Sequence, residues 1–147
     1  MITERIYVDS CACHKVRMAA RAVTRLYDDA LRPVGLRATQ LAVLVAIANE
    51  GTMSITALAQ SMAMDRTTLT RNLRPLEKAG LIAIGPEGWR RSRILEITKQ
   101  GQIRLREASP YWERAQETLR RRLGDKNWAN VHNDLDQLIR VVQRASA

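Results

Sequence analysis

The chain contains no phenylalanine, and aromatic residues make up 4% of its 147 residues. Hydrophobic residues reach 46%, so a moderate core for one domain must be filled by Ala, Leu and Ile. Long apolar runs are also missing: residues 41–48 form the longest, far short of the ~20 residues of a membrane span. Residues 1–9 mix charges and lack a signal-peptide pattern. These absences predict a soluble cytoplasmic protein that does not enter a membrane.

Residues that commonly carry chemistry are scarce. The two histidines, His14 and His132, lie far apart in the sequence, and the seven glycines show no phosphate-binding spacing. We find no nucleophile motif and no helical pair of metal ligands. Cys11 and Cys13 are too close together for a useful structural disulfide, so reduced thiols are the default. The sequence therefore predicts neither an enzyme, nor a cofactor, nor a metal centre.

Positive charge is abundant. The formal net charge is +9 and the pI is near 10.5, which indicates a polyanionic partner. Residues 66–106 hold ten basic and three acidic residues, a net +7. Composition alone is equally compatible with a membrane surface, and a charge run is often just a solvated face. The pattern of elements in this window decides between these interpretations.

Residues 54–80 predict two short helices joined by a tight turn. Ser54 is suited to cap the first, whose apolar residues Ile55, Leu58, Ala59 and Met62 recur at helical spacing. After Ala63 and Met64, the Asp65 carboxylate can accept from the first free amides of the second helix. Gly80 stands where that helix should stop. This arrangement indicates a helix-turn-helix.

The second helix separates apolar from polar residues. Leu69, Leu73 and Leu76 share one stripe, which leaves Thr and Arg on the other faces. Arg can pair bidentately with guanine, the Thr methyl can touch thymine, and hydroxyls can hold phosphates. The candidate DNA-binding residues of the whole chain are Ser54, Asp65, Arg66, Thr67, Thr68, Thr70, Arg71, Arg74, Arg90 and Arg91.

Residues 81–84 and 93–97 are short β-branched runs that predict a hairpin, and residues 85–92 form its basic tip. A wing of this kind meets the minor groove of DNA, where the narrow, negative cleft attracts arginine. Arg90 and Arg91 are the candidates for that contact.

These motifs resemble those of the MarR family of winged-helix regulators. The resemblance rests on Asp65, Leu69, Arg71, Leu73, Leu76, Glu77, Gly80 and Leu81, then Arg90 and Arg91, then Leu95, Ile97, Thr98 and Gly101. It extends upstream through Arg25, Leu26, Tyr27, Leu31, Pro33, Gly35, Leu36 and Gln40, and downstream to the last helix. One departure is Trp89, which stands where family wings usually carry an Asp before the Arg pair.

The resemblance implies a mainly α fold with a small β-hairpin wing. It predicts one domain over residues 1–147, with the winged helix-turn-helix at 39–98 and dimerisation helices at 10–35 and 102–145. Two such subunits would read pseudo-palindromic double-stranded DNA, their recognition helices ~34 Å apart.

Helical spacing predicts further helices at 14–31, at 39–49 (opened by Thr39 and apolar on almost every side), at 99–123 (capped by Thr98) and at 126–144 (capped by Asp125). Pro75 and Pro110 predict bends, and for Pro110 a true break capped by Ser109 is the alternative. The apolar stripes of the last two helices exceed what a small core can cover. They favour a homodimer over an intramolecular hairpin.

Cys13 has three interpretations. It lies fourteen residues before Tyr27, where peroxide-sensing family members carry a reactive cysteine, and helix N-termini stabilise thiolates. Arg17 and Ala38 replace the two tyrosines that hold that cysteine in those sensors. The alternatives are that Cys11 and Cys13 are small reduced residues without a role, or that they gather a metal.

The resemblance also implies a pocket for a small aromatic acid, with Arg17, Arg21, Tyr27 and Trp112 as candidate lining residues. The alternative for each is an ordinary interface or solvent position. The function predicted is a sequence-specific repressor that a ligand or thiol oxidation releases from DNA. A sequence-indifferent architectural DNA-binding protein is the alternative.

Overall fold

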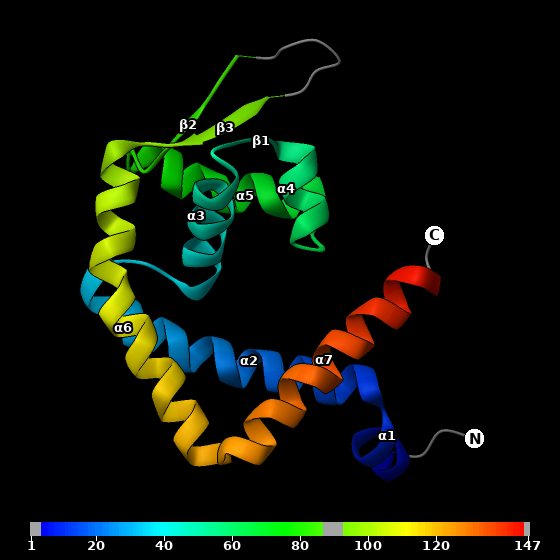
Figure 1. The fold of residues 1–147 in the computed structure, drawn as a ribbon. Coiled ribbons are helices and arrows are strands. Elements are labelled where there is room, and N and C mark those ends of the chain that lie inside the picture. Colours follow the sequence, from blue (N-terminus) through cyan, green and yellow to red (C-terminus); the bar gives the residue numbers. More distant parts are fainter. Residues whose placement is uncertain (1–3, 87–92, 146–147) are drawn as a thin grey trace. The chain divides into compact units, whose positions relative to one another are not determined.

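The computed structural model describes residues 4–86 and 93–145, which divide into two compact units, Met1–Trp112 and Glu113–Ala147. Helices dominate both, and one small sheet lies in the first unit (Figure 1). The elements in chain order are α1 (Glu4–Ser10), α2 (Ala12–Leu31), the 3-10 helix η1 (Arg32–Val34), α3 (Ala38–Glu50), β1 (Thr52–Ser54), α4 (Ile55–Ser61), α5 (Arg66–Lys78), β2 (Ile82–Ile84), β3 (Ile94–Ile97), α6 (Lys99–Leu123) and α7 (Asp125–Ala145).

The helix-turn-helix forms as predicted, because each end signal makes its hydrogen bond. The Ser54 hydroxyl accepts from the Ala57 amide at 3.0 Å and caps α4. The C-terminal end of α5 has two bonds of a Schellman motif: the Gly80 amide donates to the Glu77 carbonyl, and the Leu81 amide to the Leu76 carbonyl. Gly80 has a φ of +68°, a left-handed conformation that glycine adopts without strain.

The sheet has three strands, in the order β1-β3-β2, and both pairings are antiparallel. The predicted hairpin is confirmed by β2 and β3, in which Ile84 pairs with Leu95. The strand β1 was not predicted, and it pairs Met53 with Leu95 on the other side of β3. The winged helix therefore has its third strand directly before α4 (Figure 1).

The core is aliphatic, as the missing phenylalanines require. Leucine supplies most of the fully buried side chains, including the Leu69, Leu73 and Leu76 stripe of α5. Burial of each such side chain contributes about 1.5–3 kcal/mol to folding. The predicted central burial of the helix after residue 38 is confirmed for one set of its residues, namely Leu41, Val43, Leu44 and Ile47.

Three predicted helix starts need correction. The helix predicted over residues 14–31 is α2, which begins at Ala12 rather than His14. Thr39 does not open α3, which begins at Ala38, because the Asp28 carboxylate accepts from the Ala38 amide at 2.7 Å. Asp125 is the first residue of α7 rather than its cap, and its carboxylate instead bonds Arg120 Nε at 2.7 Å.

Other expectations for the helices have mixed outcomes. Thr98 caps α6, since its hydroxyl accepts from the Gly101 amide at 3.0 Å. Both prolines lie inside single helices: α5 contains Pro75 and α6 contains Pro110. Ser109 therefore does not cap a new helix, and the predicted alternative of a break at Pro110 is wrong.

Among the described residues, no single helix is long and apolar enough to cross a bilayer. A bent pair, Ala12–Val34 with Ala38–Glu50 at 75°, passes that test when the two helices are taken together. The second of these helices carries four buried residues of the protein core.

Candidate nucleic-acid interface

The turn between α4 and α5 fixes how the two helices meet. The Met62 amide donates to the Leu58 carbonyl and the Met64 amide to the Ala59 carbonyl, which ends α4. Ala63 adopts a φ of +50°, the left-handed conformation often found just after a helix. One further residue, Met64, leads to Asp65, the N-cap residue of α5, so the turn between the two helices is short.

Asp65 holds the first turn of α5 through two bonds from one residue. Its carboxylate accepts from the Thr68 amide at 2.8 Å and from the Thr68 hydroxyl at 2.6 Å. These hydrogen bonds lower the pKa of Asp65 below its ordinary value, the side-chain bond having the larger effect. Asp65 and Thr68 therefore act on the geometry of the helix start.

The exposed side of α5 carries the cluster that the sequence predicts. One recess of about 430 Å³ is lined by Arg66, Thr67, Thr70, Arg71 and Arg74. All five are exposed, while the leucines on the opposite side are buried. The described residues include no ion-pair partner for the three arginines, so their charges face solvent. The Thr70 hydroxyl donates to the Arg66 carbonyl at 2.7 Å, which leaves its methyl group and lone pairs for a ligand.

The two predicted wing arginines, Arg90 and Arg91, lie outside the described residues, as does Trp89. The described wing consists of β2 and β3, which project beyond the helices in Figure 1. Their base is fixed by Thr98, whose amide donates to the Leu81 carbonyl and whose hydroxyl donates to the Gly80 carbonyl at 2.6 Å.

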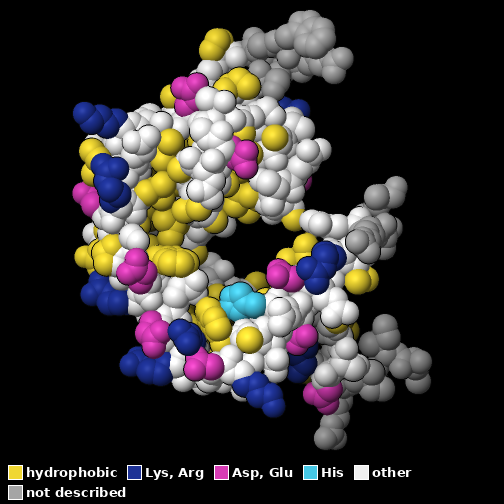
Figure 2. All heavy atoms as spheres, in the orientation of Figure 1, with side chains coloured by type: hydrophobic (Ala, Val, Ile, Leu, Met, Phe, Trp, Pro, Cys, Tyr) yellow, Lys and Arg dark blue, Asp and Glu magenta, His cyan; other side chains and the backbone are white. Residues whose placement is uncertain are grey.

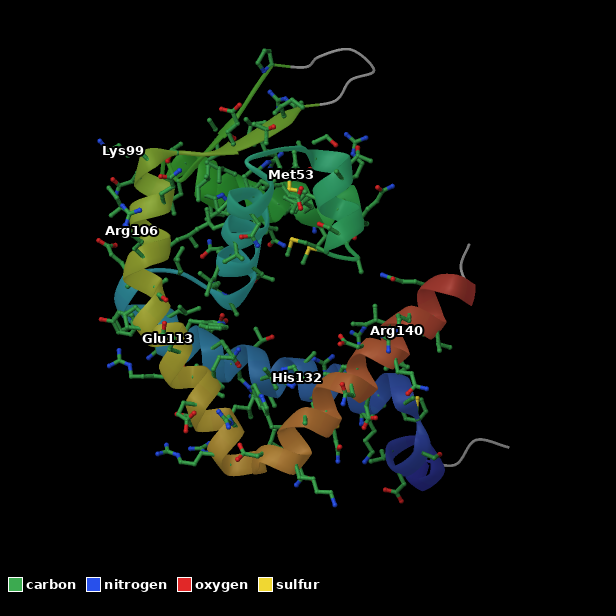
Figure 3. All side chains as sticks on the ribbon, in the orientation of Figure 1. Met53, Lys99, Arg106, Glu113, His132 and Arg140 are labelled. Atoms are coloured by element: carbon green, nitrogen blue, oxygen red, sulfur yellow. The ribbon has the colours of Figure 1, made fainter. Side chains whose placement is uncertain are left out.

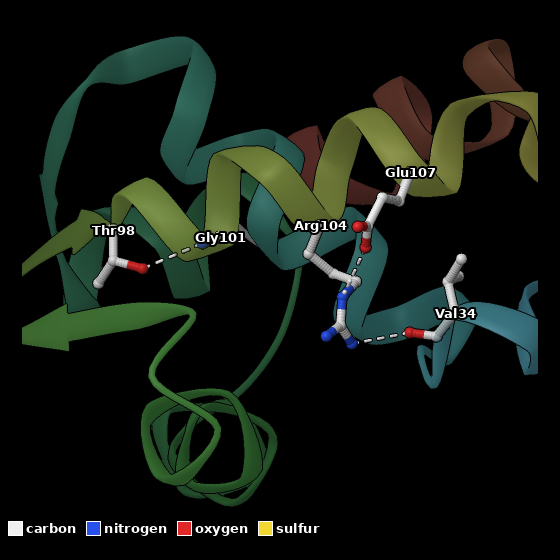
Figure 4. A network of polar contacts seen from close by, with 5 residues as sticks. All are labelled: Val34, Thr98, Gly101, Arg104 and Glu107. Atoms are coloured by element: carbon white, nitrogen blue, oxygen red, sulfur yellow. Dashed lines mark hydrogen bonds and ion pairs between the residues drawn. The ribbon is translucent and has the colours of Figure 1, made fainter.

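The basic residues of the 66–106 window do not all share one role. Lys99 and Arg106 are exposed on α6 and extend on the side away from α3 (Figure 3). Arg104 instead serves an internal contact: one terminal nitrogen donates to the Val34 carbonyl at 2.8 Å (Figure 4). Its buried Nε lies 3.2 Å from a Glu107 oxygen, an ion pair without hydrogen-bond alignment. Arg104 therefore ties the end of η1 to α6, a role that the sequence alone did not indicate.

The cysteines lie at the beginning of α2. Cys11 is its N-cap residue and is partly buried, whereas Cys13 is exposed, and both thiols are free. Close by, the ring centroids of Tyr7 and His14 lie 5.4 Å apart, and the ring planes are tilted by 56°. The described residues contain no group of three or more metal ligands, and the redox interpretation of Cys13 stays a prediction.

A separate cavity of about 440 Å³ lies in the first unit, and it brings together two of the four predicted pocket residues. Its lining residues are Tyr27, Ala38, Leu41, Ala42, Val45, Leu105, Ser109 and Trp112. Arg17 and Arg21 are not among them. The sequence also did not single out Val45 and Ser109, although the helical spacing of Leu105, Ser109 and Trp112 places these three on one face of α6.

The geometry agrees with known proteins. The family model described as MarR family matches residues 36–83. The M. tuberculosis transcriptional regulator MosR, solved in complex with DNA, is 33% identical, with a TM-score of 0.82 over 92% of this chain and 98% of that chain. A mutant of E. coli MarR, solved with operator DNA, shares the fold at 19% identity, with a TM-score of 0.81 over 92% and 99%.

A curated relative adds sequence support. The HTH-type transcriptional regulator YwoH of Bacillus subtilis, described as uncharacterized, is 24% identical over 101 residues, which cover 69% of this chain and 74% of the relative. The helix-turn-helix, the wing strands and the full-length similarity to MosR agree with the matched family model. The chain therefore belongs to the MarR family of winged helix-turn-helix transcriptional regulators.

Proposed function

We propose that this protein is a homodimeric, sequence-specific repressor of transcription that acts in the cytoplasm. In this proposal α5 enters the major groove, and Arg90 and Arg91 of the wing reach the adjacent minor groove. The observation that carries it is the recess lined by Arg66, Thr67, Thr70, Arg71 and Arg74, which gathers three guanidinium groups beside two threonines on one exposed helix face. The DNA complexes of MosR and E. coli MarR support the same use of this fold.

The dimer is supported by apolar residues that the chain leaves uncovered. In the second unit, α7 exposes large hydrophobic side chains, namely Val131, Leu135, Leu138, Ile139, Val141 and Val142. On soluble proteins, an exposed apolar surface of this kind often marks an interface with another protein. A twofold partner would cover the stripe and supply the second reading helix for a pseudo-palindromic operator.

Selection of bound sequences from a random duplex pool tests the proposal. We expect a pseudo-palindromic consensus and an affinity at least ~10³-fold above that for random DNA at the same salt concentration. Equal affinity for all sequences would instead favour the architectural alternative, which needs only the basic charge.

We further propose that an effector releases the protein from its operator, either a small aromatic ligand in the cavity beside Tyr27 and Trp112 or an oxidant at Cys13. The exposed position of Cys13 in the first turn of α2 favours access by peroxide. We expect peroxide to lower the DNA affinity of the wild type and to leave a Cys13→Ser variant unaffected, as measured by fluorescence anisotropy. Equal responses of the two proteins would reject oxidation of Cys13 as the release signal, and a ligand in the cavity would remain as the proposed effector.

A further inference from the structure

The cavity beside α3 and α6 has an uncharged lining. None of its eight residues is Lys, Arg, Asp, Glu or His. The polar side-chain groups are the hydroxyls of Tyr27 and Ser109 and the indole N–H of Trp112, and the remaining five residues are Ala, Leu or Val. Figure 2 shows hydrophobic side chains gathered over α3 and the adjoining part of α6.

The cavity is also the right size for a small molecule, because ligand sites usually enclose about 300–1,000 Å³. Two of its large apolar residues stay open to solvent: Val45 is 41% exposed and Trp112 is 40% exposed. An apolar ligand would remove both surfaces from water, which is favourable.

The surroundings disfavour negative charge. Burial raises the pKa of Tyr27, so the lining resists the formation of a phenolate there. Several arginines of the same unit lie outside the cavity lining. Arg25, Arg32 and Arg37 line a different recess, together with Asp28 and Asp29. Arg104 is engaged by the Val34 carbonyl and by Glu107 (Figure 4).

We propose that this cavity selects uncharged aromatic effectors that carry a neutral polar group, such as a hydroxyl, and discriminates against aromatic carboxylates. A carboxylate that sits against this lining gives up part of its hydration, and the lining contains no cation that could replace it. A neutral hydroxyl in the same place gives up much less hydration free energy than a carboxylate does. The inference rests on the proposed function in one respect, that the cavity is the effector site.

The same helices connect the cavity to the DNA-reading part. Leu41 and Val45 line the cavity, while Val43, Leu44 and Ile47 of the same helix are buried in the core behind α5 and β3. On α6, Leu105 lines the cavity and Ala108 is fully buried. An occupant therefore touches the elements that support the reading helix, and it can shift the population of DNA-competent molecules.

Titration calorimetry of the full chain at pH 7 with 2-naphthol and with 2-naphthoate tests the charge preference. The two probes share a ring system, and at this pH the first is neutral and the second anionic. We expect 2-naphthol to bind about tenfold or more tightly than 2-naphthoate, the ratio that corresponds to ~1.4 kcal/mol. Equal binding, tighter binding of 2-naphthoate, or binding of neither probe would each overturn the inference.

Matched variants on α3 locate the binding. Ala42 lines the cavity and is exposed, so Ala42→Phe should fill the cavity without disturbing the core and abolish 2-naphthol binding. Asn49→Phe, on an exposed position of the same helix outside the cavity, is the control and should bind like the wild type. Unchanged binding by Ala42→Phe would place the ligand elsewhere and overturn the proposal.

A charge introduced at the cavity tests the cause. Val45→Lys should strengthen 2-naphthoate binding by roughly two- to fivefold, the range of a partly exposed ion pair, whereas Asn49→Lys should not. If Val45→Lys does not reduce the difference in affinity between 2-naphthol and 2-naphthoate, the electrostatic explanation is overturned.

A parallel DNA-binding measurement separates the two proposals. If 2-naphthol binds with the expected preference and the operator complex survives saturating ligand, the charge selectivity stands and the effector role fails. If the protein binds no DNA at all, the proposed function fails, and the calorimetric result still decides the selectivity.

Discussion

At the scale of single residues, two threonine hydroxyls of α5 donate hydrogen bonds to acceptors at the start of the same helix. Thr68 donates to Asp65 at 2.6 Å, and Thr70 donates to the Arg66 carbonyl at 2.7 Å. Because a hydroxyl has one hydrogen to donate, neither residue can donate to a base or phosphate while these bonds persist. In the proposed DNA complex, we therefore expect direct base contacts from α5 to come mainly from the arginines of its recess, which have the donors that guanine requires.

Arg71 is the arginine at the centre of that recess in sequence, so its removal tests the reading face. We expect Arg71→Ala to weaken binding to the selected operator by about 1–3 kcal/mol, as measured by fluorescence anisotropy at fixed salt. Arg121→Ala removes a charge from another exposed position, at the end of α6, and serves as the control. Equal losses in the two variants would mean that net charge, and not the reading face, governs affinity.

The Asp65 cap predicts a pH dependence. Hydrogen bonds from Thr68 lower the pKa of Asp65 in the folded protein, so the cap stabilises the fold at pH values above the ordinary carboxyl pKa. That contribution is lost as the pH falls through the lowered pKa. We expect Asp65→Ala to reduce the thermal unfolding midpoint at pH 7 and to have a smaller effect near pH 2–3.

Asp65→Asn is the control for this titration, because asparagine caps helices without an ionisable group. It should retain most of the stability at pH 7. If Asp65→Ala shows the same deficit at both pH values, the carboxylate charge is not the source of the stabilisation.

At the scale of elements, the sequence predicted the helices whose ends are fixed by nearby residues. It did not predict the element that depends on contacts with distant residues. Ser54, Asp65 and Gly80 act on amides or carbonyls within a few residues, and the sequence alone placed both helices of the helix-turn-helix. The strand β1 could not be found in this way. It is three residues long, and its pairing partner β3 is about 40 residues further along the chain.

Side-chain contacts with residues further away in the sequence explain two other differences. Thr39 has the right type for a helix cap, but Asp28, ten residues earlier, satisfies the Ala38 amide instead. Arg104 belongs to a basic window, but its partner Val34 lies 70 residues away. The reading face was predictable from the leucine spacing of α5, whereas the uncharged cavity needed α2, α3 and α6 together.

The junction of the wing and α6 leaves no space at Gly101. A Cβ atom there would lie 2.1 Å from the Leu81 carbonyl oxygen and 2.7 Å from an Ile97 side-chain carbon, so the backbone must shift. We expect Gly101→Ala to lower the free energy of unfolding by about 1–3 kcal/mol, as measured by urea denaturation. Gln102→Ala, at the exposed neighbouring position, should change it little. A wild-type midpoint for Gly101→Ala would show that the junction can relax.

At the scale of the whole molecule, the exposed stripe of α7 predicts that assembly is required for function. Leu135 is 44% exposed in the isolated chain. If a twofold partner covers it, Leu135→Glu affects both copies and should raise the dimer Kd by ~100-fold or more, at about 1.5–3 kcal/mol for each leucine. Sedimentation equilibrium measures this change.

Asn133→Glu adds the same charge at a polar exposed position on α7 and should leave the assembly intact. A monomeric wild type would contradict the prediction, as would a Leu135→Glu variant with an unchanged Kd. Operator affinity should fall together with dimerisation, because one subunit offers one half-site contact.

The hydroxyl of Thr98 lies between the end of α5 and the start of α6. It donates to the Gly80 carbonyl just after α5. It also accepts from the Gly101 amide in the first turn of α6 (Figure 4). Thr98 lies 18 positions after Gly80, and the segment between them contains the wing strands, so this hydrogen bond links the two ends of the wing. While both hydrogen bonds persist, we expect a tilt of α6 at its first turn to move the end of α5 and the root of the wing with it. In the proposed DNA complex, the major-groove contacts of α5 and the minor-groove contacts of the wing would therefore be lost or kept together.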